Sequence, residues 1–188
     1  MKIADSQRLR FEMVTEQDAQ LLYDLNLDPE VMRYINGGKP STMAEIEDYF
    51  IPRIQGFTNS ENGWGLWKVT TLASESELGD TFIGWILVRP MDFYTDEPKH
   101  SDLEVGWRFA QMSWGKGYAT EAAKAVCNAL VKQSSGNGKA ITHFSAIADP
   151  HNKGSINIMI KLGMEYIKNT SVDTPEGEVE VVLYRMAV

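Results

Sequence analysis

A strand that runs into a helix through a glycine-containing turn, at residues 104–123, constrains the fold of this chain more than any other stretch. Residues 104–109 (EVGWRF) are aromatic and branched and predict a strand, and GKG follows at 115–117. Small or apolar residues then recur over 119–131 at the spacing of an amphipathic helix with one buried face. The first N–H groups of such a helix lack intrahelical partners and, with the helix dipole, favour an anion. The stretch therefore predicts a turn that binds a phosphorylated ligand.

Two familiar phosphate-binding motifs do not fit this turn. The sequence lacks the GxxxxGK[ST] of a P-loop. A dinucleotide fingerprint would place a third glycine where Thr120 stands and would follow the first strand of its unit, whereas this turn lies past the middle of the chain. Because GxG also opens many ordinary turns, a purely structural turn is the alternative interpretation.

Composition narrows the class of protein and its partners. The 188 residues suit a single domain, 1–188, and no apolar run approaches the length of a membrane span. One cysteine and three scattered histidines predict a cytoplasmic protein without disulfides or a metal site. A net charge of −8 disfavours nucleic acid and anionic membranes as partners and is compatible with cationic amines.

The strand, turn and helix together resemble the signature of the GNAT acyltransferase superfamily. The matching residues are Glu104, Val105, Gly106, Trp107, Phe109 and the unbroken WGKGYATEA at 114–122. The chain is most similar to the Rim-type branch, the ribosomal-protein N-terminal acetyltransferases. A second family pattern, N-x-x-[AS]-x-x-x-[YV]-x-x-x-G-[FM], is matched at Asn152, Ser155, Gly163 and Met164.

This resemblance spans most of the chain and implies its fold. We expect an α/β (α+β) domain with a twisted mixed sheet of about seven strands and helices on both faces. The sheet should be mostly antiparallel, with a central parallel pair that splays to admit coenzyme A. The helix that connects this pair is expected from Gly117 to about Lys132, and the polar QSSGNGK that follows, 133–139, is expected to be a turn.

The resemblance also implies acetyl-CoA as co-substrate and no metal. The residues expected to contact it lie on the strand, in the turn and at the start of a later helix: Trp107, Arg108, Phe109, Met112, Trp114, Gly115, Lys116, Gly117, Tyr118, Ala119, Thr120, Asn152 and Ser155. Backbone N–H groups from about Met112 to Thr120 should hold the pyrophosphate, with the Lys116 ammonium as an auxiliary charge. Met112 replaces the usual Gln or Arg of the family, so recognition must rest on the backbone.

The implied reaction is direct attack of an amine on the thioester, without a covalent enzyme intermediate. A backbone N–H of residues 105–109 is the expected donor to the oxyanion. Glu104 is the candidate general base, acting through a water; the alternative is a solvated carboxylate paired with a neighbour. Cys127 lies on the apolar stripe of the helix and is expected in the core.

For the acid that protonates the leaving thiolate, the resemblance offers Ser155. Met159 stands where the general family pattern has a tyrosine in this role. The alternative interpretation is structural, because Asn152 can cap a helix that has Ser155 at its third position.

The acceptor is expected to be a protein or peptide N-terminal α-amino group. A small cationic amine, such as a polyamine or an aminoglycoside, is the close alternative. An alternative of another class is a CoA-binding regulatory module without turnover, which Met112 and Met159 would suit. The protein is expected to be a monomer or a homodimer.

Overall fold

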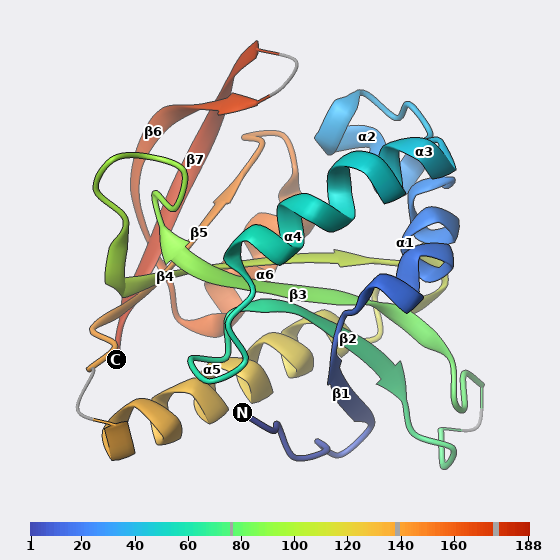
Figure 1. Ribbon diagram of the computed structural model, residues 1–188, viewed down its shortest axis with the longest axis horizontal. Helices are drawn as coiled ribbons and strands as arrows, with labels where there is room; N and C mark the ends of the chain where they lie inside the picture. The colour runs from blue at the N-terminus through green and yellow to red at the C-terminus, as the bar shows by residue number, and fades with distance from the viewer. Residues whose placement is uncertain (76, 138–139, 175–176) are drawn as a thin grey trace.

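A single seven-stranded sheet, in the order β1-β2-β3-β4-β5-β7-β6, organises the molecule (Figure 1). This computed structural model describes residues 1–75, 77–137, 140–174 and 177–188. The strands are β1 (Leu9–Met13), β2 (Gly65–Thr71), β3 (Phe82–Met91), β4 (Lys99–Phe109), β5 (His143–Ala148), β6 (Glu165–Thr174) and β7 (Gly177–Ala187). All neighbouring strands pair antiparallel except β4 and β5, which confirms the predicted mixed sheet.

The parallel pair is short and then opens. Its register runs only from Asp102↔His143 to Glu104↔Ser145, although β4 continues to Phe109 and β5 to Ala148. Beyond Glu104 the two strands therefore part. Backbone groups of the second half of β4 that would face β5 in a regular sheet have no β5 residue opposite them.

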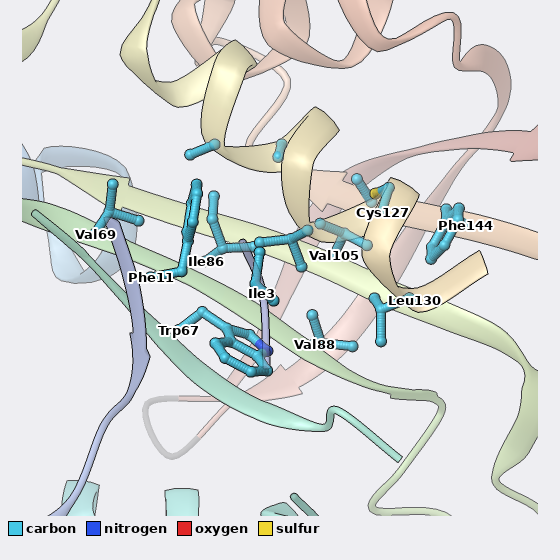
Figure 2. Packing of buried hydrophobic residues seen from close by; sticks show 14 of the residues in the cluster. Ile3, Phe11, Trp67, Val69, Ile86, Val88, Val105, Cys127, Leu130 and Phe144 are labelled. Carbon is cyan, nitrogen blue, oxygen red and sulfur yellow. The ribbon is translucent and has the colours of Figure 1, made fainter. Parts of the chain in front are cut away.

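Helices cover both faces of the sheet, as predicted (Figure 1). One face carries α5 (Tyr118–Asn137) and α6 (Lys153–Leu162). The other carries α1 (Ala19–Asn26), α2 (Pro29–Asn36), α3 (Met43–Glu45), the π-helical turn η2 (Ile46–Phe50) and α4 (Ile51–Phe57). Figure 2 shows the first core, where Cys127 and Leu130 of α5 pack over Val88, Val105 and Phe144 of the sheet.

The connecting helix α5 is longer than predicted. It ends at Asn137 instead of Lys132, so the turn expected at 133–139 is helical over 133–137, and residues 138–139 lie outside the described residues. Serine and glycine cost a helix only about 0.5–1 kcal/mol each, and the stretch contains no proline to stop it. The Ser134 hydroxyl also donates to the Val131 carbonyl at 3.0 Å, which suits a helical backbone.

Candidate active site

The turn between β4 and α5 presents a continuous row of free backbone donors. The N–H groups of Ser113 and Trp114 bond within the turn, and the first bond of α5 runs from the Glu121 N–H to the Gly117 carbonyl at 3.0 Å. Between them, the N–H groups of 115–120 have no partner among the described residues. Gly115 and Gly117 have φ values of 74° and 83°, a left-handed backbone that glycine adopts without strain. The turn therefore has the donors of an anion site.

Arg8 lies beside this turn, although it was not among the residues predicted for the site. Its Nη1 donates to the Lys116 carbonyl at 3.1 Å, and its guanidinium carbon is 4.2 Å from the centre of the Tyr118 ring. Its Nε and Nη2 each lie 2.7 Å from Oε2 of Glu121. Because Arg8 and Glu121 are 113 residues apart, no local pattern could have indicated the pair. The contact fixes the first turn of α5 to the residue that precedes β1.

Lys116 is not a free charge, because an acidic loop covers it. The loop between β2 and β3 places Glu77 Oε2 2.5 Å from the Lys116 Nζ, and this hydrogen bond lowers the pKa of Glu77. In the same loop, Glu75 accepts a hydrogen bond from the Tyr118 hydroxyl at 2.6 Å, which raises the pKa of Tyr118. An anion at the turn would therefore compete with Glu77 for Lys116.

The predicted residues Trp107 and Ser155 meet across the opening between the strands. The Trp107 indole Nε1 donates to the Ser155 hydroxyl oxygen at 3.2 Å. Asn152 is the N-cap of α6, with Oδ1 accepting from the Ser155 N–H at 3.0 Å, as the structural interpretation anticipated. Met159 is buried in the core below. The opening is thus bounded by β4 on one side and by the start of α6 on the other.

A buried polar network closes the other end of the opening. The Ser145 hydroxyl donates to Asp102 Oδ1 at 2.8 Å and accepts from the Arg185 Nε at 2.9 Å. Arg185 also pairs with Asp102 through Nη2 at 2.9 Å. This network, the Asp102–Ser145–Arg185 triad, joins β4, β5 and β7 where the parallel pairing is still intact. It fixes the point from which the strands diverge.

The two faces of β4 hold different parts of the site. Val105 and Phe109 belong to the core under α5, and Trp107 packs against that core. Cross-strand partners share a face, so Gly106 and Arg108, opposite Leu87 and Trp85, face the α1–α4 side. The Arg108 side chain therefore points away from Trp107, and only its backbone could contribute to the predicted CoA contact.

Glu104 also faces the α1–α4 side and is committed to an ion pair. Its Oε2 lies 2.7 Å from the Nε of Arg89, its cross-strand partner, and the Glu104 side chain is only 8% exposed. Burial works against the charge of Arg89, but Glu104 outweighs it and raises the Arg89 pKa. Glu104 is thus paired with a neighbour, as the alternative interpretation held, but it is buried and not solvated.

Arg108 has an unusual environment. Its Nη1 donates to Oδ1 of Asn26 at 2.5 Å, and its guanidinium lies over the rings of Trp85 and Phe50, at 5.1 and 5.8 Å. No carboxylate of the described residues pairs with it. Burial lowers the pKa of Arg108 to about 10.

The remaining predicted residues have clear positions. Met112 and Trp114 are exposed on the turn, and the Trp114 indole donates to the Phe109 carbonyl at 2.8 Å, bracing the turn against β4. Cys127 is buried, and burial raises its thiol pKa to about 12, which confirms a core residue. The described residues contain no acidic, histidine or cysteine cluster suited to a metal ion. Within the same ranges, no helix has the length and apolarity that crossing a membrane requires.

Comparison with known proteins identifies the domain. A family model described as "Acetyltransferase (GNAT) domain" matches residues 8–165. The chain is 29% identical over 164 residues to the uncharacterized protein YkkB of Bacillus subtilis, covering 86% of this chain and 84% of that protein. It is 27% identical over 188 residues to an Aspergillus fumigatus FsC-acetyl coenzyme A-N(2)-transacetylase, covering 95% of this chain and 74% of that protein.

Solved structures share the fold. A GNAT-family acetyltransferase from Bacillus anthracis superposes with a TM-score of 0.71 at 22% identity, over 100% of this chain and 98% of that one. RimL, a ribosomal L7/L12 α-N-protein acetyltransferase in complex with coenzyme A, gives 0.71 at 10% identity with the same coverage. The aminoglycoside acetyltransferase AAC(6')-Ib in complex with coenzyme A gives 0.69 at 17% identity, over 95% and 94%.

Proposed function

The chain belongs to the GNAT acetyltransferase family, and from this we propose that it transfers an acetyl group from acetyl-CoA to the α-amino group of a protein or peptide N-terminus. The observation that carries the proposal is the adjacency of two features. Free backbone N–H groups at 115–120 lie in the turn after β4, the strand that separates from β5 beyond Glu104. These are the donors and the opening that a pyrophosphate and its extended pantetheine arm require.

The residues present fit acetyl-CoA, which supplies an activated acetyl thioester when bound. The N–H row at 115–120 would hold the pyrophosphate, and a backbone N–H of residues 105–109 would bind the developing oxyanion. Ser155 would protonate the leaving thiolate. Its oxygen accepts a hydrogen bond from Trp107, so its own hydroxyl proton is available for donation. Asn152 holds Ser155 in place by capping α6.

An α-amino acceptor suits the state of the candidate base. At pH 7 roughly one-sixth of an α-amino group is neutral, whereas a lysine-like amine is almost wholly charged, a difference of about 3.7 kcal/mol in the cost of deprotonation. The Glu104 carboxylate is held by Arg89 at 2.7 Å and is therefore already committed to an ion pair. An acceptor that needs little help from a base fits this arrangement. Glu104 would then assist through a water.

A small cationic amine is the second candidate. The net charge of −8 and the shared fold with an aminoglycoside acetyltransferase support it. Both candidate reactions would use the same acetyl-CoA site. They differ only in the amine acceptor that would bind on the α1–α4 side of β4. The distinction is therefore a question of acceptor chemistry.

Release of free CoA thiol from acetyl-CoA tests the proposal. Wild type and Glu104→Gln are assayed from pH 6 to 9 with peptides of varied N-termini, spermidine and an aminoglycoside. We expect turnover with peptides, and a loss in Glu104→Gln that shrinks as pH rises if the carboxylate assists deprotonation. Turnover confined to spermidine or the aminoglycoside would favour the second candidate. Tight binding of acetyl-CoA without any turnover would refute both and leave a CoA-binding module.

A further inference from the structure

Two buried donors without partners lie next to each other on the α1–α4 face of the sheet. Among the buried side-chain nitrogen and oxygen atoms of the described residues, only Trp85 Nε1 and Arg108 Nε make no hydrogen bond. Trp85 and Arg108 are directly opposite across β3 and β4. Leaving a buried donor unsatisfied is costly, so two at one place need a common explanation.

The charge of Arg108 is also uncompensated, unlike that of the other enclosed arginines. Arg89 pairs with Glu104 and Arg185 pairs with Asp102, each through a close ion pair. Arg108 has only the neutral amide oxygen of Asn26. Ordered water could satisfy the two N–H groups but would not offset the charge. A carboxylate would do both, because guanidinium and carboxylate match in charge and geometry.

Arg108 lies on the same face of β4 as Glu104, the candidate base for the acceptor amine. Arg108, Gly106 and Glu104 follow each other along one face of β4, and this is the face opposite Trp107. Two residues of a strand span about 7 Å, so the guanidinium lies within side-chain reach of Gly106. Gly106 has no side chain of its own, and the Leu87 side chain packs beside it. The Arg108 residue as a whole is half-buried, and its unpartnered Nε atom is buried.

We infer that Arg108, together with the Trp85 indole N–H, binds a carboxylate carried by the amine acceptor. This inference rests on the proposed function and narrows its substrate class. The carboxylate could be the α-carboxylate of a free amino acid or the side chain of an N-terminal Asp or Glu in a peptide. A polyamine or an aminoglycoside would instead meet a cation of like sign.

Matched acceptors test the inference and separate the two sources. A peptide that begins with Asp is compared with the same peptide beginning with Asn, and free alanine with alanine amide, by kcat/KM for CoA release. We expect wild type to favour the carboxylate-bearing member of one pair by about 10- to 100-fold, the range of a charge-assisted contact. A preference in the peptide pair identifies the side-chain source, and one in the alanine pair identifies the free amino acid.

Two variants remove the uncompensated charge of Arg108 in different ways. Arg108→Gln deletes the guanidinium, and Asn26→Asp keeps it but gives it an internal carboxylate in place of the amide oxygen at 2.5 Å. Both should abolish the carboxylate preference, and Asn26→Asp should also raise the melting temperature, so the test survives if Arg108→Gln folds poorly. Arg33→Gln, which alters an exposed arginine already paired with Glu30, should keep the preference.

The outcomes distinguish this inference from the proposed function. Equal kcat/KM within both pairs in wild type, or a preference that persists in Asn26→Asp, would overturn the carboxylate site while leaving acetyl transfer intact. No turnover of any amine would refute the proposed function. In that case the CoA-bound protein is titrated with the N-acetylated products of both pairs. Tighter binding of the carboxylate-bearing product of one pair by wild type but not by Asn26→Asp supports the site, and equal binding within both pairs overturns it.

Discussion

Replacing Glu104 by glutamine should destabilise the protein because it leaves the Arg89 guanidinium without its carboxylate. The two side chains are 8% and 18% exposed, and the ion-pair distance is 2.7 Å. Removing one partner of a buried pair costs about 3–5 kcal/mol. Glutamine keeps an oxygen that can accept the Nε–H bond, so we expect the lower end, about 3 kcal/mol. For a chain of this length that lowers the melting temperature by about 6–12 °C.

The double variant Arg89→Met/Glu104→Gln separates the structural from the chemical role of Glu104. Removing both charges replaces an unpaired buried cation by an apolar side chain, and such replacements are often close to neutral. We therefore expect the double variant to recover most of the stability lost in Glu104→Gln. Thermal unfolding measures stability, and CoA release below the melting temperature measures activity. If Glu104 also assists deprotonation, activity stays low in the double variant although stability returns.

Two results would refute this reasoning. A loss below about 0.5 kcal/mol in Glu104→Gln would mean that the ion pair contributes no more than a surface pair. Full recovery of activity along with stability in the double variant would mean that Glu104 acts only by holding Arg89. Arg10→Gln, which alters an exposed arginine that pairs with Asp80 at 3.4 Å, is the matched control and should change stability little.

Three further predictions follow from other contacts in the structure. Glu77→Gln should tighten acetyl-CoA binding about two- to fivefold by calorimetry, because it frees the Lys116 ammonium; unchanged binding at low salt would contradict competition at the turn. Burial opposes ionisation of Asp18, but the hydrogen bonds from Lys68, at 2.8 Å, and from Thr15 prevail and lower the pKa of Asp18 from its ordinary value. The ion pair therefore stabilises the fold fully above about pH 4 and loses its effect as pH falls through the lowered pKa, so Asp18→Asn should lower the melting temperature more at pH 7 than at pH 3. Cys127 should resist thiol reagents at pH 8 until the protein unfolds, because burial raises its pKa to about 12; rapid labelling of folded protein would contradict this.

Local patterns predicted the fold well where a single stretch decides the structure. The strand at 104–109, the glycine turn and the apolar stripe of α5 lie next to each other in sequence, and their structure follows from periodicity and backbone sterics. The predicted end of α5 was wrong because polar residues and glycine lower helix propensity without forbidding a helix. The helix continues for five more residues, to Asn137. The mixed topology of the sheet was predicted from the family resemblance and not from any local sequence pattern.

The site was less predictable because its contacts join distant parts of the chain. The hydrogen bond of Trp107 with Ser155 spans 48 residues and that of Arg108 with Asn26 spans 82. Arg108 was predicted to contact CoA because it lies within the signature stretch. Side chains alternate along β4, however, so the Arg108 side chain lies on the face opposite Trp107. Lys116 was expected as an auxiliary charge, and its partner Glu77 could not be known before the loop was placed.

The strand order β5-β7-β6 has a consequence for how the chain can fold during synthesis. The interior position beside β5 is filled by β7, which is made after the edge strand β6. Until residues 177–187 leave the ribosome, β5 presents an unsatisfied edge, and Arg185 has not yet joined Asp102 and Ser145. A nascent chain at this stage has an open strand ready to pair with another chain. Premature stop codons before 177 should therefore yield aggregating products rather than a protein that merely lacks its last strand.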